Sequence, residues 1–151
     1  MKPEYNLPLV VAVVLTWNDT EMTTKCIDSV FKSDYENLQI VLVDNGSEPP
    51  GCPIVKKIFP NITTVQLDEN KGFTGGCNRG IEKALEMDAE YVFLLNNYTV
   101  VHQQAVGKIV TVLEKTQDAS LACPAILHPG DEKRIQFFTA SINRNLARHI
   151  H

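Results

Sequence analysis

Polar residues follow three apolar runs of this sequence, and their types suit the recognition of a nucleotide-like ligand. Thr16 to Asn18 follow the first run, Asp44 and Asn45 follow the second, and Asn96 follows the third. Carboxylate and amide groups can accept or donate hydrogen bonds to a nucleobase or a ribose. The residues alone leave two interpretations of Asp44 open, because Asp and Asn also favour turns through hydrogen bonds to their own backbone.

A glycine-rich stretch, ENKGFTGGCNRG, spans Glu69 to Gly80 and contains glycines at positions 72, 75, 76 and 80. Glycine permits positive φ angles and a close approach of the backbone to a ligand. A helix predicted to begin near Gly76 would offer free amides to an anion such as phosphate. The stretch matches neither the Gly-Lys-Ser/Thr phosphate loop nor the Gly-x-Gly-x-x-Gly pattern. A ligand-binding loop is the favoured interpretation, and a flexible turn with a helix cap is the alternative.

Alternating apolar runs and amphipathic stretches predict the elements that position these residues. We expect strands at 9–16, 38–44, 62–68, 91–95 and 121–127, and helices at 19–31, 54–59, 76–87 and 103–115. HPGDEK is expected to be a turn, with an edge strand at RIQFF after it. Strand–helix alternation predicts an α/β fold with a mostly parallel sheet. In such sheets ligands bind beyond the carboxyl ends of the strands, where the polar residues fall.

Composition limits the function classes. The 151 residues, 44% apolar and 21% charged, predict one domain spanning 1–151. A net charge of -4 argues against nucleic-acid binding. No apolar run approaches the roughly 18 residues of a membrane span, and MKPEYNLP lacks signal-peptide features, so a cytoplasmic location is expected. The four cysteines lack metal-knuckle spacing and are interpreted as reduced packing thiols.

Taken in order, several motifs resemble those of one enzyme family. The sequences VVAVVLTWND, VDNGS, ENKGFTGGCNRGI and LLNNYT are similar to the family 2 inverting glycosyltransferases of the GT-A fold, especially their rhamnosyltransferase-like branch. The resemblance covers about 9–106 and, more faintly, 125–142. It implies a Rossmann-like α/β/α sandwich that binds a UDP- or dTDP-sugar donor. It further implies transfer of the sugar, with inversion, to a saccharide or another hydroxyl acceptor.

The resemblance also implies a donor-binding site. Asp44 would bind the base or ribose, the loop 16–18 would form a wall beside a pyrimidine, and the loop 70–78 would close over the nucleotide. The implied nucleotide-sugar-binding residues are Thr16, Asn18, Asp44, Asn45, Asn70, Gly72, Phe73, Gly76, Asn78 and Asn96.

The family's metal motif implies that Mg²⁺ or Mn²⁺ is held against the donor diphosphate. In this sequence Asn96 and Tyr98 occupy the motif positions, and Tyr98 stands where the family has an Asp. A phenol is uncharged near neutral pH and is a poor substitute for a carboxylate ligand. The substitution predicts a weakened or lost metal site.

Family members are usually longer, and their later half carries the acceptor surface and the catalytic base. The chain is therefore expected to correspond to the donor-binding half. No residue is assigned as the base, since Asp131 and Glu132 fall in the expected turn. The alternative is an inactive remnant that binds a nucleotide or a protein partner. A nucleotidyltransferase is a more distant alternative, but TWNDTEMT is not the basic glycine-rich loop that it would need. An exposed sheet edge also predicts a homodimer through the C-terminal segment.

Overall fold

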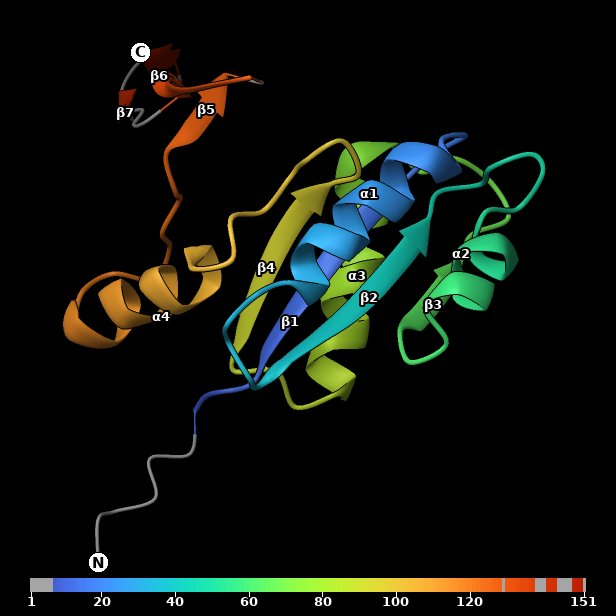
Figure 1. The fold of residues 1–151 in the computed structure, drawn as a ribbon, viewed down its shortest axis with the longest axis horizontal. Coiled ribbons are helices and arrows are strands. Elements are labelled where there is room, and N and C mark those ends of the chain that lie inside the picture. The colour runs from blue at the N-terminus through green and yellow to red at the C-terminus, as the bar shows by residue number, and fades with distance from the viewer. Residues whose placement is uncertain (1–6, 129, 138–140, 144–147, 151) are drawn as a thin grey trace, which may run out of the picture. The chain divides into compact units, whose positions relative to one another are not determined.

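The computed structural model describes residues 7–128, 130–137, 141–143 and 148–150, and the chain divides into two compact units (Figure 1). The first unit ends at Val106 and the second begins at Gly107. The expectations for the first six residues, and much of the C-terminal segment to which a dimer contact was assigned, lie outside the described residues. Each unit is described separately below.

A parallel sheet of four strands forms the centre of the first unit. The strands are β1 (Val10–Thr16), β2 (Leu38–Asp44), β3 (Thr63–Gln66) and β4 (Tyr91–Asn96). Their order is β3-β2-β1-β4, and every pair is parallel. The predicted α/β fold with a parallel sheet is confirmed for these four strands.

Three helices belong to the first unit, and a fourth begins at its end and continues into the second unit. They are α1 (Thr20–Phe31), α2 (Cys52–Ile58), α3 (Gly72–Glu86) and α4 (Ala105–Lys115). None of the helices in the described part of the chain is long and apolar enough to cross a membrane.

The two faces of β1 belong to two separate core clusters, because successive side chains of a strand point to opposite faces. Ala12 and Val14 pack with buried residues of α1 and α2. Val11, Val13 and Leu15 pack instead with buried residues of α3. Figure 1 shows the same arrangement, with α1 and α3 on opposite faces of the sheet. Both faces of the sheet are therefore covered, which explains the uninterrupted apolar sequence of β1.

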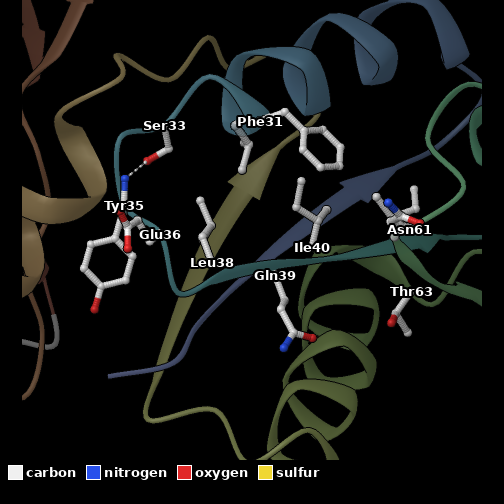
Figure 2. Close-up of a pocket in the computed structure, with 11 residues that line it drawn as sticks. Phe31, Ser33, Tyr35, Glu36, Leu38, Gln39, Ile40, Asn61 and Thr63 are labelled. Carbon is white, nitrogen blue, oxygen red and sulfur yellow. Dashed lines mark hydrogen bonds between the residues drawn. The ribbon is translucent and has the colours of Figure 1, made fainter. Parts of the chain in front are cut away.

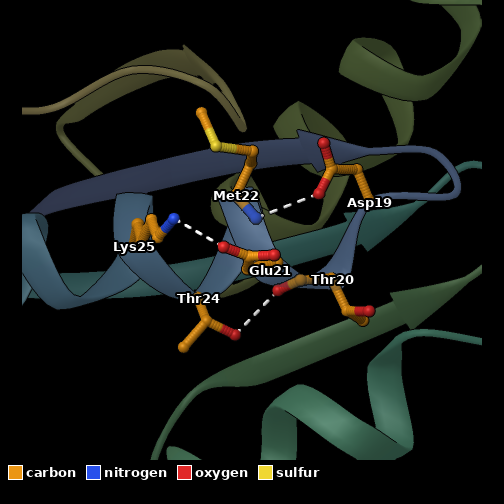
Figure 3. A network of polar contacts seen from close by, with 6 residues as sticks. All are labelled: Asp19, Thr20, Glu21, Met22, Thr24 and Lys25. Carbon is orange, nitrogen blue, oxygen red and sulfur yellow. Dashed lines mark hydrogen bonds and ion pairs between the residues drawn. The ribbon is translucent and has the colours of Figure 1, made fainter.

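Asp19, the residue before α1, caps the first turn of that helix (Figure 3). The carboxylate of Asp19 accepts a hydrogen bond from the Met22 amide at 3.0 Å. Glu21 and Lys25, four residues apart, form an exposed ion pair at 2.6 Å. An N-cap acid satisfies an amide that the helix cannot pair internally. The predicted start of this helix is confirmed.

Helix α3 begins at Gly72, four residues before the predicted start, so most of the expected glycine-rich loop is helical. A Cβ atom on Gly76 would lie 2.4 Å from Leu15 Cδ1, and one on Gly80 would lie 2.2 Å from Val13 Cγ1. These two glycines therefore let the helix pack closely on β1. The predicted loop was too long because the helix already begins at Gly72.

The second unit contains short antiparallel strands. Its strands are β5 (Ile126–His128), β6 (Asp131–Phe137), β7 (Ser141–Asn143) and β8 (Arg148–Ile150). The pairs are β5 with β6 and β7 with β8. The predicted strand at 121–127 is shorter than expected, and Leu121 is exposed. The predicted turn is also shorter, because β6 already begins at Asp131, after Gly130 with a φ of 78°.

Candidate functional site

The carboxyl ends of the central strands meet at one edge of the sheet. Thr16 lies opposite Asp44 in the β1–β2 pair, and Leu15 lies opposite Asn96 in the β1–β4 pair. The chain proceeds from β1 outward through β2 and β3, and then returns to β4 on the other side of β1. The ends of β1 and β4 therefore flank a topological switch point, where open α/β sheets bind ligands. The prediction that the polar strand ends gather at one edge is confirmed.

The turn after β4 contacts the end of β1 and the start of α1. The side-chain amide nitrogen of Asn97 lies 3.4 Å from Thr16 Oγ1 and 3.3 Å from Thr23 Oγ1. The Asn96 amide nitrogen donates a hydrogen bond to the Tyr98 hydroxyl at 2.8 Å. Tyr98 is 66% exposed, whereas Thr16 is buried among these partners. Thr16 therefore holds the turn, and Tyr98 faces solvent.

The turn after β1 is linked to the turn after β2. The Asn18 amide donates a hydrogen bond to Ser47 Oγ at 2.8 Å, and the Asn18 side chain accepts one from the Glu48 amide at 2.8 Å. Asn18 has a φ of 54°, which asparagine tolerates better than most residues. These bonds leave the side chain of Trp17 exposed at the carboxyl end of β1.

The carboxylate of Asp44 is hydrogen-bonded to the backbone of the loop that follows β2. Its side chain is completely buried. One carboxylate oxygen accepts the Ser47 amide at 2.9 Å, and the other accepts the Gly51 amide at 2.6 Å. In this structure the buried carboxylate therefore shapes the loop that follows β2, as the turn interpretation expects. The contact of Asp44 with a base or ribose stays a prediction.

Asn45 joins the end of β2 to the start of α3. Its side-chain amide nitrogen donates hydrogen bonds to Asn70 Oδ1 at 2.9 Å and to the Gly72 carbonyl at 3.1 Å. Its amide oxygen accepts a hydrogen bond from the Lys71 amide at 2.9 Å. Gly46, with a φ of 78°, allows close contact, since a Cβ there would lie 2.5 Å from the Glu69 carbonyl carbon. The two segments implied to share the donor site therefore lie side by side.

The predicted residues of the glycine-rich stretch fall into two groups. Gly72 and Phe73 are exposed at the start of α3, beside Asn70, whose side chain accepts the Gly72 amide at 2.8 Å. Gly76 is buried against the sheet, and Asn78 is exposed in the second turn of the helix. Asn70, Gly72 and Phe73 therefore lie together at the exposed start of α3, whereas Gly76 is buried and does not reach solvent.

Charge near the start of α3 is balanced locally. Lys71 forms an exposed ion pair with Glu69, and this pairing lowers the pKa of the Glu69 carboxyl group. Further along the helix, Arg79 pairs with Glu82 at 2.5 Å on the exposed surface. The Lys71 ammonium is the cationic group that lies closest in sequence to the first turn of α3.

A surface depression lies at the other edge of the sheet (Figure 2). It has a volume of about 430 Å³ and is lined by residues such as Tyr35, Leu38 and Ile40. Leu38 begins β2, so this depression lies at the amino end of that strand. Phe31, which also lines it, stacks on Phe59 with ring centroids 5.3 Å apart. The depression is thus separate from the polar cluster at the carboxyl ends.

The residues at the expected metal position do not fit a hard divalent cation. Asn96 and Tyr98 offer neutral oxygen atoms, and the Asn96 amide nitrogen is turned toward the Tyr98 hydroxyl. The buried Asp44 already accepts two backbone hydrogen bonds. Among the described residues, no group of three or more His, Cys, Asp or Glu side chains could hold a metal ion. Mg²⁺ and Mn²⁺ prefer carboxylate ligands, which this arrangement does not supply.

The buried thiols are packing groups. Burial raises the pKa of Cys26 to about 11 and that of Cys52 to about 11. Burial also raises the pKa of Cys77. Because the thiolate is the metal ligand and nucleophile, these three groups are chemically inert near neutral pH. Their predicted role as reduced packing thiols agrees with this environment.

The sequence did not predict the contacts of three residues that join the turns of the site. Asn97 and Ser47 link the strand-end turns, and Thr23 on α1 completes the contact with Asn97. Asn97 and Ser47 stand inside the motifs that carry the family resemblance, so the motifs were the available signal. Nothing in the spacing of Thr23 indicated its contact with the β4 turn.

Solved structures with a GT-A-like fold share this arrangement of helices on a parallel sheet. *Staphylococcus aureus* TarS, residues 1–349 in complex with UDP-GlcNAc, superposes with a TM-score of 0.62 at 21% identity. The match covers 72% of this chain and 32% of that chain. The mannosyltransferase PcManGT from *Pyrobaculum calidifontis*, in complex with GDP-Man and Mn²⁺, gives a TM-score of 0.52 at 21% identity. This match covers 62% of the present chain and 28% of the mannosyltransferase chain.

The chain belongs to glycosyl transferase family 2, whose sequence profile matches residues 11–148. It is 28% identical over 109 residues to the poly-beta-1,6-N-acetyl-D-glucosamine synthase of *Staphylococcus aureus* strain COL. That match covers 69% of this chain and 26% of the relative. An uncharacterized glycosyltransferase of *Haemophilus influenzae* is 26% identical over 113 residues, covering 73% and 34% of the two chains. The chain therefore spans about a quarter to a third of the length of these relatives.

Proposed function

We propose that this domain binds a nucleotide-diphospho-sugar, with a UDP-sugar as the first candidate, at the carboxyl edge of its parallel sheet. The observation that carries the proposal is the side-by-side placement of the β2 turn and the first turn of α3 through Asn45. The family membership and a structural neighbour in complex with UDP-GlcNAc support this choice of donor.

The parts of the donor are assigned to two exposed aromatic residues, Trp17 and Phe73, and to the start of α3. Trp17 and Asn18, at the carboxyl end of β1, would form a wall beside the base. Phe73, which is 60% exposed in the first turn of α3, would cover the nucleotide. Helix N-termini favour anions, so the diphosphate would lie near the first amides of α3 and near Lys71. Asp44 and Asn45 act indirectly, by holding the two turns in place.

The reaction that we propose for the whole protein is inverting glycosyl transfer to a hydroxyl acceptor. In that class of reaction the acceptor oxygen attacks the anomeric carbon from the face opposite the nucleotide, and a general base removes its proton. A dTDP-sugar and a rhamnosyl donor remain within the proposal. The acceptor and the base are left unassigned, and a cytoplasmic location and a homodimer stay predictions that fractionation and a sizing measurement check.

Calorimetric titration tests the proposal directly. We expect UDP and UDP-GlcNAc to bind with micromolar to millimolar dissociation constants, whereas ADP binds at least tenfold more weakly. Phe73→Ala should weaken UDP binding at least fivefold. Leu85→Ala is the matched control, because Leu85 is also 60% exposed but lies at the other end of α3. Absence of binding by every nucleotide tested, including dTDP and GDP, would exclude the proposal.

A second candidate is a domain that binds the nucleotide without turning it over. Tyr98 at the position of the family's acidic ligand favours this candidate, because the leaving diphosphate would lack a bound cation to neutralise its charge. The candidates are separated by incubating the protein with UDP-GlcNAc and measuring UDP release with and without saccharide acceptors. Binding without any UDP release would favour the second candidate.

A further inference from the structure

The side chains of the turn after β4 bear on whether a divalent cation takes part in binding the donor. In this turn the side-chain amide nitrogen of Asn96 donates a hydrogen bond to the hydroxyl of Tyr98, so the two side chains at the motif positions are joined to each other. Neither side chain carries a negative charge. A hard cation that keeps several of its waters binds proteins mainly through one or two carboxylates. The turn supplies neither of these carboxylates.

Three acidic side chains near this edge of the sheet already have partners of their own. Asp44 is completely buried, and its two oxygens accept the amides of Ser47 and Gly51. Asp19 lies close to the turn, because the Asn97 amide nitrogen is 3.4 Å from its carbonyl oxygen. Its carboxylate, however, caps α1 through Met22. Glu69, after β3, is paired with Lys71.

We infer that this domain binds its nucleotide without a divalent cation, and that Tyr98 is the residue responsible. The inference rests on the proposed function, since it concerns how the same donor is bound. Tyr98 is 66% exposed at the switch point of the sheet, so a carboxylate introduced there would face solvent and any bound nucleotide. The local backbone does not depend on the phenol ring, because the Thr99 amide closes the turn onto the Asn96 carbonyl at 3.1 Å.

The test compares the full chain with Tyr98→Asp and Tyr98→Phe in calorimetric titrations with UDP. Each protein is titrated in about 1 mM EDTA and again in about 5 mM MnCl₂, in a buffer of roughly physiological ionic strength. For the unmodified protein we expect the dissociation constant to change less than twofold between the two conditions. Tyr98→Asp should bind at least tenfold more tightly with Mn²⁺. Tyr98→Phe should remain insensitive to Mn²⁺, because it adds no carboxylate.

Two outcomes would overturn the inference. In the first, the unmodified protein binds UDP at least tenfold more tightly in MnCl₂ than in EDTA. In the second, Tyr98→Asp has the same dissociation constant for UDP in both conditions, although its circular dichroism spectrum is unchanged. Failure of the proposed function looks different, because UDP would then fail to bind in either condition. Electron paramagnetic resonance of free Mn²⁺ gives a separate measurement without nucleotide. We expect the unmodified protein to leave the Mn²⁺ signal unchanged, and depletion of that signal would contradict the inference.

Discussion

The carboxylate of Asp44 accepts the Gly51 amide at 2.6 Å, across a loop of six intervening residues. A second bond, from the Ser47 amide at 2.9 Å, uses the other oxygen. Because the side chain is buried, water cannot replace either bond. This carboxylate therefore organises the loop between β2 and α2, and the loop in turn holds Asn18 through Ser47 and Glu48.

Asp44→Ala should lower the free energy of unfolding by about 3 kcal/mol, because it leaves two buried amides without acceptors. Urea unfolding followed by circular dichroism measures the change. Asp68→Ala is the control, since Asp68 is an exposed acid in a neighbouring loop and its removal should change stability by less than about 0.5 kcal/mol. Equal effects of the two substitutions would contradict the role assigned to Asp44.

Gly80→Ala should destabilise the protein by about 2 kcal/mol through overpacking, even though alanine favours a helix. The added methyl would lie 2.2 Å from Val13 Cγ1 and 3.0 Å from Val43 Cγ2. Thermal and urea unfolding measure the effect. Asn78→Ala, at an exposed position of the same helix, should leave stability unchanged or slightly raised.

A double-mutant cycle shows whether this cost comes from the contact with Val13. In a Val13→Ala background, the substitution Gly80→Ala should be clearly less destabilising, because the clashing Cγ1 atom is absent. Additive effects would instead indicate that Gly80 matters for another reason.

Trp17 is the only tryptophan in the sequence, and it is 55% exposed at the carboxyl end of β1. Stacking of a uracil ring on its indole should quench the fluorescence. We expect UDP to reduce the emission with the same midpoint that calorimetry gives. N-acetyltryptophanamide in the same titration corrects for light absorbed by UDP. If UDP binds by calorimetry and the corrected emission does not change, the base does not reach the end of β1.

The buried thiols predict a loss of stability at high pH. Burial raises the pKa of Cys26 and Cys52 from 9.0 to about 11, so the folded state keeps protons that the unfolded chain loses. Their effect on folding is absent below pH 9, where both states carry neutral thiols. As pH rises from 9 toward 11, the unfolded state binds fewer protons, and the free energy of unfolding falls.

Urea midpoints between pH 8 and pH 10.5 measure this effect. The double variant Cys26→Ala/Cys52→Ala should be less stable at pH 8 because of the lost packing, yet its midpoint should fall less steeply with pH. Cys123→Ala is the matched control, because Cys123 is exposed and its removal should leave the slope unchanged. The same slope in all three proteins would show that other groups account for the alkaline loss.

The sequence alone determined the four parallel strands, the start of α1 and the gathering of polar residues at one sheet edge. These features follow from local rules, because apolar runs, N-cap acids and the strand–helix order act over short stretches of chain. The motifs also indicated the family correctly, because the resemblance depended on several motifs in a shared order.

Only the tertiary structure decided what the individual residues do. The sequence left open whether Asp44 faces a ligand or forms a turn, and in the fold its buried carboxylate accepts the amides of Ser47 and Gly51. The sequence predicted Gly76 and Gly80 within a helix, but it gave no sign that the side chains of β1 lie where their Cβ atoms would be. The two glycine contacts with β1 join positions more than 60 residues apart, and local pattern carries no information about which distant side chain will fill the space beside a residue.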